Sequence, residues 1–363
     1  MKQKLIVIVC LIIGVTMSAC GNVSPEQKSG ESVTSQNTQS EVDSNASNEV
    51  SRDVFAMDTY MTVTAYGSGA QEAVEKAVSE IGRLDELLST GKESSEIAQI
   101  NQNGGGTLSS DASYLVERSM EISKDTDGIF DIAIYPIMQA WGFTTGEYTV
   151  PSEDNLRQLL TLTDVSQIQF DKNQSSISFG KEGMKIDLGG IAKGYTSSRI
   201  MEIYRECGVT SGIVNLGGNV QVLGTKVDGS MWRVAIQNPK EDGTYLGVLS
   251  TKDCAVITSG GYERYFEKDG TTYHHIIDPT TGYPADSGLT SVTIVSEDGT
   301  LADGLSTSLF IMGKEKAIEY WKNHSEEFDT ILLTEDGTLY VTEGIANDFN
   351  SESEFQIVEK DKE

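Results

Sequence analysis

The sequence is short of cysteine and of basic side chains. Only 4 of its 363 residues are cysteine, which excludes a disulfide framework and a zinc site built from cysteine pairs. The chain has 55 acidic residues but only 27 lysines and arginines, so its formal net charge is −28. Because so acidic a chain repels phosphate groups, we expect no nucleic-acid partner. A phosphorylated ligand would need a metal ion to bridge the like charges.

The N-terminal segment lacks an apolar run long enough to cross a membrane. Residues 5–17 are mainly apolar, follow lysines at positions 2 and 4, and lead into MSAC, which ends at Cys20. A run of that length is typical of a signal peptide. Because MSAC is similar to a bacterial lipobox, we predict a lipoprotein signal peptide over 1–19 and a lipid on Cys20. A secretory signal with a chance cysteine is the alternative.

Beyond Cys20 the composition indicates a tether followed by a folded region. Residues 20–50 are rich in Ser, Asn, Gln and Glu and have little to bury, as is typical of a flexible tether. With the lipid, this predicts a protein held on the extracytoplasmic face of the cell membrane. Residues 51–348 are expected to fold, and 349–363 to form a frayed acidic tail. Cys207 and Cys254 are expected to be ordinary thiols, although they could pair.

Periodicity in residues 51–348 predicts an α+β domain. Apolar spacing indicates helices over Ala70–Leu88, Ser94–Asn101 and Ser110–Thr126, and a half-buried strand over Val54–Gly67. QIQF and SISF are predicted to form a hairpin, and GIVNL, NVQVL, WRVAIQ, YLGVLS and AVITS to form short strands. Few of these strands alternate with single helices. We therefore predict one domain of antiparallel sheets with flanking helices.

Two segments combine residue types that suit catalysis, and each also has a structural explanation. Adjacent strand residues point to opposite faces, so in YHHIIDP only one of His274 and His275 can face a given pocket, and either could be a structural imidazole. In LADGLSTS, Asp303 and Thr307 share one face of a helix predicted to start near Ala302, and their oxygens suit Mg²⁺. Asp303 could instead cap that helix.

Two further segments could contact a ligand. KIDLGGIAKGYT, residues 185–196, is expected to end a strand and start a helix near Ile191, where glycines, the helix N-terminus and Lys193 could attract phosphate. Its spacing matches no phosphate-loop motif, so a plain strand-to-helix turn explains it equally well. In TDGIFD, Phe130 could pack against a planar ring and Asp131 bind a ribose or adenine; alternatively, Phe130 and Trp141 could serve core packing around Pro136.

Seven segments in order resemble the ApbE family of FAD:protein FMN transferases. They are MDTYMTV, TDGIFD, KIDLGGIAKGY, NLGGNV, SGGYERYF, HIIDPTTGYP and ADGLSTSLFIMG, between Met57 and Gly313. The resemblance implies a single ApbE-like catalytic domain that depends on Mg²⁺ and takes FAD as its substrate. Such an enzyme transfers FMN to a threonine hydroxyl of an acceptor protein and releases AMP. The acceptor would be a membrane or extracytoplasmic redox protein.

The resemblance also implies roles for single residues. His275 takes the position of the catalytic histidine, and the metal ligands would be Asp303, Thr307 and the carbonyl of Gly190. The residues implied to contact FAD are Met57, Ile129, Phe130, Asp131, Asp187, Lys193 and Thr290. Gly91 stands where many relatives have a tyrosine. Two alternatives are an FAD pyrophosphatase that yields FMN and AMP, and a flavin-binding lipoprotein without activity.

Overall fold

The computed structural model describes residues 48–361, so the predicted signal peptide, Cys20 and most of the tether lie outside the described residues. The helices are α1 (Ala70–Leu88), α2 (Glu96–Asn103), α3 (Ser110–Asp125), α4 (Tyr135–Trp141), α5 (Glu153–Leu159), α6 (Ala192–Glu206), α7 (Gly299–Met312), α8 (Lys314–His324) and α9 (Glu343–Ala346), with 3₁₀ turns η1 (Ile132–Ile134), η2 (Leu160–Leu162) and η3 (Val165–Gln167). Among the described helices, none is long and apolar enough to span a membrane.

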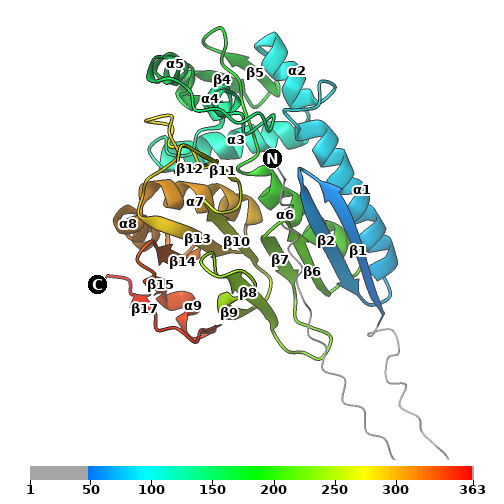
Figure 1. Ribbon diagram of the computed structural model, residues 1–363. Helices are drawn as coiled ribbons and strands as arrows, with labels where there is room; N and C mark the ends of the chain where they lie inside the picture. The colour runs from blue at the N-terminus through cyan, green and yellow to red at the C-terminus, as the bar shows by residue number, and fades with distance from the viewer. Residues whose placement is uncertain (1–47, 362–363) are drawn as a thin grey trace, which may run out of the picture. The chain divides into compact units, whose positions relative to one another are not determined.

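The strands form one large sheet and three small ones (Figure 1). The nine-stranded sheet has the order β1 (Glu49–Ala56), β2 (Thr59–Tyr66), β6 (Ser211–Leu216), β7 (Asn219–Leu223), β10 (Ala255–Gly260), β13 (Leu289–Ser296), β14 (Asp329–Thr334), β15 (Leu339–Thr342) and β17 (Gln356–Val358). The small sheets join β11 (Tyr265–Lys268) with β12 (Thr271–His274), β16 (Phe349–Asn350) with β9 (Tyr245–Thr251) and β8 (Trp232–Gln237), and β3 (Gly105–Thr107) with β5 (Ser176–Phe179) and β4 (Ile168–Asp171).

The large sheet is buried on both faces over much of its width. Helices α1, α6, α7 and α8 pack on one face, and the β8–β9–β16 sheet packs on the other. Along β10, Ala255 and Ile257 join the core beneath the helices, whereas Val256 joins the core beneath the small sheet. Such strands are apolar at nearly every position, because both faces need apolar side chains. The α+β prediction is confirmed.

Most predicted elements are confirmed, but the first strand is wrong. Helix α1 has the predicted bounds, the β4–β5 hairpin is present, and the five strands predicted after Gly208 are β6 to β10. The segment 54–67 is a hairpin, in which β1 pairs with β2 across a two-residue turn at Met57 and Asp58. Both turn residues have positive φ, 48° and 60°, as a tight hairpin turn requires. Apolar alternation continues through this turn, so periodicity alone did not reveal it.

Three other expectations are corrected, two at the ends of the domain and one in its middle. The chain after Asn347 is not frayed: Phe349 is buried beneath the large sheet, and β17 pairs in parallel with β15. At the other end β1 begins at Glu49, two residues before the predicted start of folding. Residues 186–188 form no strand; the Asn101 side chain bonds the amide and the carbonyl of Ile186, where a strand would have had a backbone partner.

Antiparallel pairing brings four chain segments to one end of the large sheet. The β1–β2 turn, the β6–β7 turn at Gly217 and Gly218, the last residue of β10 and the first residue of β13 all lie there, as the registers show. We call this the site end of the sheet. It gathers segments that are more than 200 residues apart in the chain, since the β1–β2 turn is at residue 57 and β13 begins at residue 289.

Candidate active site

Asp303 lies where helices α6 and α7 meet. Helix α7 begins at Gly299 and not near Ala302, and Asp298 is its N-cap. The Asp303 carboxylate is buried and accepts hydrogen bonds from the Gly194 amide, at 2.8 Å, and from Asn219 Nδ2, at 3.0 Å. Asp303 therefore caps α6 from a neighbouring helix and does not cap its own. Burial raises the pKa of this carboxyl, and Lys193 and the two hydrogen bonds oppose that rise.

Glycine at position 194 allows this contact. A Cβ on Gly194 would lie 2.1 Å from the Gly299 carbonyl oxygen and 2.6 Å from Asp303 Cβ. Gly190 lies two residues before the first residue of α6 and precedes its N-cap, Ile191. The first turn of α6 thus points the Gly194 amide at Asp303, and the Gly190 carbonyl lies just outside the helix.

Thr307 follows Asp303 by one turn of α7. Its Oγ1 lies 3.4 Å from Ser259 Oγ on β10, and Ser259 Oγ lies 2.7 Å from Ser306 Oγ. The predicted oxygen ligands therefore come from α7 and from the segment just before α6. Helices α6 and α7 pack directly against each other. This packing places Asp303 at the start of α6.

Lys193 and Asp187 lie on either side of the glycine pair. Lys193 is half-buried, and its positive charge acts on Asp303, on Glu263 and on His275. The Asp187 carboxylate accepts a hydrogen bond from the Gly189 amide at 2.8 Å, and burial raises the pKa of its carboxyl. An anionic ligand at this turn would meet one lysine beside several carboxylates.

His274 and His275 point to opposite sides, as expected for adjacent residues. His274 Nε2 bonds the Ala285 carbonyl at 3.1 Å, and its ring packs edge-on against Phe310. His275 Nδ1 lies 3.2 Å from the Arg264 carbonyl oxygen. Because a carbonyl only accepts, Nδ1 must carry the proton, which leaves the lone pair on Nε2. His274 is thus the structural imidazole, and His275 has a ring nitrogen ready to accept a proton.

The protein environment keeps the His275 ring neutral. Desolvation is the main cause, and the positive charge of Arg264 adds to it; together they lower the pKa of the imidazole to about 3. A charged imidazolium is unfavourable in such a place, because it loses hydration and faces a cation. At neutral pH the ring is therefore in its basic form.

Met57 and Phe130 frame the same region. The Met57 amide donates to Asp85 Oδ1 at 3.0 Å, and its sulfur lies 3.9 Å from Thr196 Oγ1 on α6. The buried Phe130 ring packs where Gly190 and Gly304 have no side chain: a Cβ on either would lie 3.3 or 3.7 Å from Phe130 Cε2. Phe130 thus contacts the backbone of both walls of the α6–α7 junction.

The other three residues predicted to contact FAD have different surroundings. Asp131 caps η1, with one carboxylate oxygen 2.7 Å from the Ala133 amide and the other 3.2 Å from the Val165 amide. Burial raises the pKa of the Asp131 carboxyl to about 6. Ile129 is half-buried, and Thr290 lies at a break in register between β13 and β14. A bulge of that kind re-aims a side chain at the end of a strand.

Sequence reasoning missed three polar residues of the site. Asn219 holds Asp303, and Arg264 lies 3.7 Å from Asp58 while its carbonyl accepts from His275. Part of the Glu263 side chain is accessible to solvent, but many protein atoms lie around its carboxyl group. Desolvation by these atoms raises the pKa of the carboxyl to about 7. All three lie in segments noted for their glycines, NLGGN and SGGYERYF. The available signal was the charge of Glu263 and Arg264 in SGGYERYF, and NLGGN has no charged residue that could have marked Asn219.

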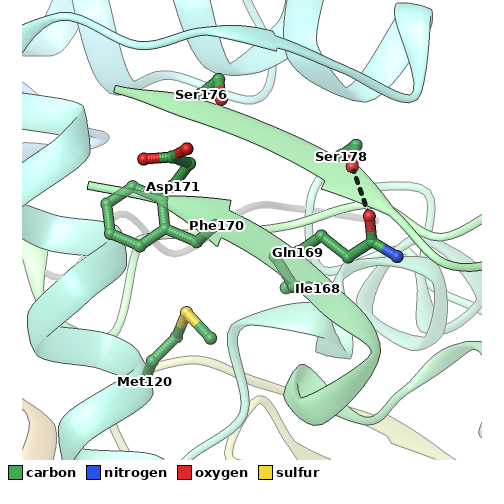
Figure 2. Close-up of a pocket in the computed structure, with 7 residues that line it drawn as sticks. All are labelled: Met120, Ile168, Gln169, Phe170, Asp171, Ser176 and Ser178. Atoms are coloured by element: carbon green, nitrogen blue, oxygen red, sulfur yellow. Dashed lines mark hydrogen bonds between the residues drawn. The ribbon is translucent and has the colours of Figure 1, made fainter. Parts of the chain in front are cut away.

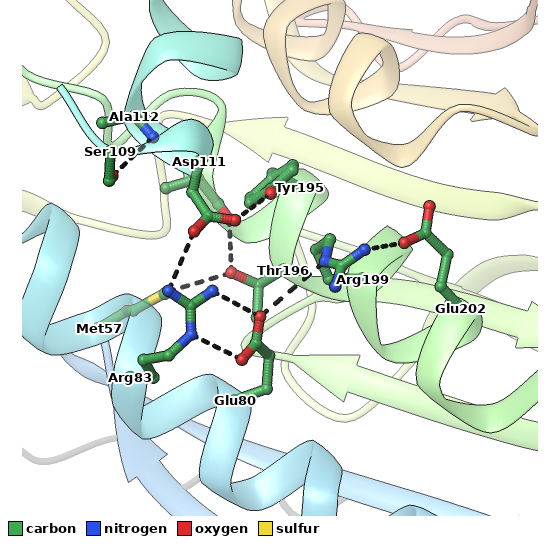
Figure 3. Close-up of polar contacts among 11 residues, drawn as sticks. Met57, Glu80, Arg83, Ser109, Asp111, Ala112, Tyr195, Thr196, Arg199 and Glu202 are labelled. Carbon is green, nitrogen blue, oxygen red and sulfur yellow. Dashed lines mark hydrogen bonds and ion pairs between the residues drawn. The ribbon is translucent and has the colours of Figure 1, made fainter. Parts of the chain in front are cut away.

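Polar contacts connect α6 with α3 and, through Asp111, with α1 (Figure 3). Tyr195, two residues after Lys193, bonds Asp111 of α3, and Arg83 of α1 binds Asp111 at 3.0 Å and Glu80 at 2.7 Å. Arg83 Nη1 and the Tyr195 hydroxyl both approach the Asp111 carboxylate, and the arginine lowers its pKa against the effect of burial. The start of α6 is therefore held by α3 directly and by α1 through Asp111.

A cavity outside this site is lined by Met120 of α3 and by the β4–β5 hairpin (Figure 2). Its lining residues are Met120, Ile168, Gln169, Phe170, Asp171, Ser176 and Ser178. None of these is a predicted site residue. The chemistry therefore gathers at the site end of the large sheet and not in this cavity.

Cys207 and Cys254 are both free, as expected, and Cys254 is buried. Thr251 Oγ1 lies 2.8 Å from the Cys254 sulfur, and burial raises the pKa of this thiol to about 11. A thiol with so high a pKa is a poor nucleophile. Neither cysteine is needed to explain the site.

The sequence profile of the ApbE family matches residues 57–332, about three quarters of the chain. The chain belongs to the ApbE family. It is 34% identical over 266 residues to the FAD:protein FMN transferase of Klebsiella pneumoniae (strain 342), covering 72% of this chain and 82% of that protein. It is 33% identical over 290 residues to the FAD:protein FMN transferase of Treponema pallidum (strain Nichols), covering 74% and 80%.

Solved ApbE structures share the fold. The crystal structure of the ApbE protein of Thermotoga maritima aligns with a TM-score of 0.78 and 32% identity, over 83% of this chain and 99% of that one. The apo form of the flavinyl transferase ApbE of Pseudomonas stutzeri aligns with a TM-score of 0.75 and 27% identity, over 84% and 98%. The site described above therefore lies within the region common to the ApbE family, since Met57 and Thr307 both fall inside residues 57–332.

Proposed function

We propose that this ApbE protein transfers FMN from FAD to a hydroxyl group of an acceptor protein. The observation that carries the proposal is the convergence of Asp303, Lys193 and His275 at the α6–α7 junction and the site end of the sheet. The names of its relatives, FAD:protein FMN transferase, give the reaction class. We further propose a threonine as the acceptor residue and AMP as the other product.

The donor set suits Mg²⁺. Among residues 48–361 no three His, Cys, Asp or Glu side chains cluster around a common point, so a metal here needs other oxygens. Asp303 would supply a carboxylate, Thr307 a hydroxyl, and Gly190, which precedes the N-cap of α6, a backbone carbonyl. Mg²⁺ prefers oxygen ligands and is commonly held by one or two carboxylates together with substrate phosphates. When bound, it supplies charge neutralisation at the pyrophosphate.

Each polar residue then has a distinct task in the transfer. Lys193 offsets the charge of the pyrophosphate and of the departing AMP. His275 Nε2 accepts the proton of the acceptor hydroxyl while the oxygen of that hydroxyl forms a bond to the phosphorus of the FMN half. In the same step the pyrophosphate P–O bond breaks and AMP leaves. Met57, Ile129, Phe130, Asp131, Asp187 and Thr290 are proposed to hold FAD around this centre.

The cellular setting is also a proposal. We propose that cleavage before Cys20 and lipidation of this residue anchor the domain on the extracytoplasmic face of the cell membrane, through the tether that precedes β1. A membrane or extracytoplasmic redox protein is the acceptor that suits this location. Radiolabelled palmitate should enter the wild-type protein but not the Cys20→Ala variant. Equal labelling of both would refute the anchor.

A transfer assay tests the reaction. Incubating residues 48–363 with FAD, Mg²⁺ and a flavin-carrying acceptor protein should give an acceptor band that fluoresces under ultraviolet light after denaturing electrophoresis. His275→Ala and Asp303→Asn should abolish the band, whereas Ser178→Ala in the β4–β5 hairpin should not. AMP release at the same rate with and without acceptor would instead indicate an FAD pyrophosphatase, in which water replaces the hydroxyl. FAD binding without AMP release would indicate a flavin-binding protein.

A further inference from the structure

Two aromatic side chains stand exposed on one face of the β1–β2 hairpin. Phe55 is 62% exposed and Tyr60 65%. They are direct cross-strand partners, and their rings meet edge to face with centroids 5.0 Å apart. We call them the Phe55–Tyr60 patch. Aromatic residues are enriched at protein interfaces, where a few of them commonly carry much of the binding energy.

The patch adjoins the candidate active site. Phe55 and Tyr60 flank the turn of Met57 and Asp58, and Asp58 Oδ2 lies 3.7 Å from Arg264 Nη2. The Arg264 carbonyl in turn accepts hydrogen bonds from the amide of His275, at 3.0 Å, and from its Nδ1, at 3.2 Å. Two contacts therefore link the hairpin turn to the residue proposed to accept the hydroxyl proton.

The surroundings of the patch are acidic. On the same face of β1, Asp53 is exposed and accepts a hydrogen bond from Thr62 at 2.7 Å. The Asp58 side chain is 85% exposed at the turn. Arg264 offsets part of the Asp58 charge, but a surface that covers the patch still meets aromatic rings flanked by the carboxylates of Asp53 and Asp58. A partner surface that complements the patch has an apolar centre with lysine or arginine side chains around it.

We propose that the Phe55–Tyr60 patch is the docking surface for the acceptor protein, an inference that rests on the proposed FMN transfer. A protein acceptor must bring a hydroxyl to His275 Nε2, so its body has to lie over the elements beside this residue. The β1–β2 hairpin is such an element, and its exposed rings meet the acceptor there. The acceptor presents an apolar patch bordered by basic side chains. FAD itself has no part in this contact.

A comparison of two substrates tests the proposal. In the Phe55→Ala/Tyr60→Ala variant, kcat/KM for the purified acceptor that the wild type labels should fall roughly tenfold or more, mainly through KM. Transfer to a synthetic peptide spanning the labelled threonine, and AMP release without acceptor, should stay as in the wild type. Ile357→Ala is the matched control, because Ile357 is 55% exposed on β17 at the opposite edge of the same sheet.

The possible outcomes separate docking from chemistry. Unchanged KM for the protein acceptor overturns the proposal, and so does an equal loss with protein, with peptide and in AMP release, because the patch would then act on the FAD site. Raised salt should weaken the protein reaction more than the peptide reaction, because the docking contact involves charge. If the wild type releases AMP but labels no acceptor, the proposed transfer itself fails, and the docking surface fails with it.

Discussion

The contact between α6 and α7 yields a sharp prediction for Gly194. In Gly194→Ala, the new Cβ would lie 2.1 Å from the Gly299 carbonyl oxygen, where an ordinary contact begins at 3.4 Å. The helices would have to separate by about 1.3 Å. The same shift would lengthen the 2.8 Å bond between the Gly194 amide and Asp303 beyond hydrogen-bonding distance. Both the packing of α6 and the position of the proposed metal ligand would change.

The expected cost follows from these two losses. Overpacking of a tight contact costs about 1–3 kcal/mol, and a lost hydrogen bond to a buried carboxylate about 1.5–3 kcal/mol. We therefore expect Gly194→Ala to lower the free energy of unfolding by about 2.5–6 kcal/mol, the sum of these two ranges. Gly82→Ala in α1 is the control: no atom lies within 4 Å of its new Cβ, so it should stabilise the protein by about 0.5–1 kcal/mol.

Two assays check this prediction. Urea unfolding monitored by circular dichroism gives the free energy for both variants and for the wild type. The Mg²⁺ concentration for half-maximal AMP release should rise about tenfold or more in Gly194→Ala and stay unchanged in Gly82→Ala. A Gly194→Ala protein within about 0.5 kcal/mol of the wild type, with the same Mg²⁺ dependence, would refute the reasoning.

Three further predictions concern single side chains of the site. Asn219→Ala removes one hydrogen bond to Asp303, and should raise the Mg²⁺ concentration for half-maximal AMP release while lowering stability by about 1.5–3 kcal/mol in urea. The His275 pKa is lowered to about 3, so the pH profile of transfer should show no acid limb near 6.5; a limb there in the wild type would contradict this. The pKa of Asp131 is shifted in the opposite direction to that of His275, from 3.8 up to about 6. The contribution of Asp131 to stability is therefore present below pH 3.8 and is lost as the pH rises through 6. Urea unfolding at pH 4 and 7 should show a loss on the order of 2 kcal/mol that is smaller in Asp131→Asn; the same pH dependence in both proteins would refute it.

Local patterns in the sequence predicted most helices and strands because each has one buried face. In α1, Ala73, Ala77, Ile81 and Leu84 recur at helical spacing, and all are fully buried. The hairpin at Met57 and Asp58 escaped the same reasoning because a two-residue turn preserves the alternation on which the prediction rests. Likewise, the acidic composition after Asn347 concealed Phe349 and Val358, two buried residues that tie the C-terminal segment to the sheets.

By itself, the sequence determined the residue types of the site and the order in which they occur. The ordered segments pointed to the ApbE family, and the spacing of Asp303 and Thr307 placed both on one face of a helix. Only the tertiary structure decided which groups meet. Gly194 directs its amide to Asp303 because the absence of a Cβ lets two helices touch, and the sheet register brings Asn219, Arg264 and the exposed Phe55 and Tyr60 to the same end. Contacts across more than 100 residues depend on packing and strand register, which leave no mark on local periodicity.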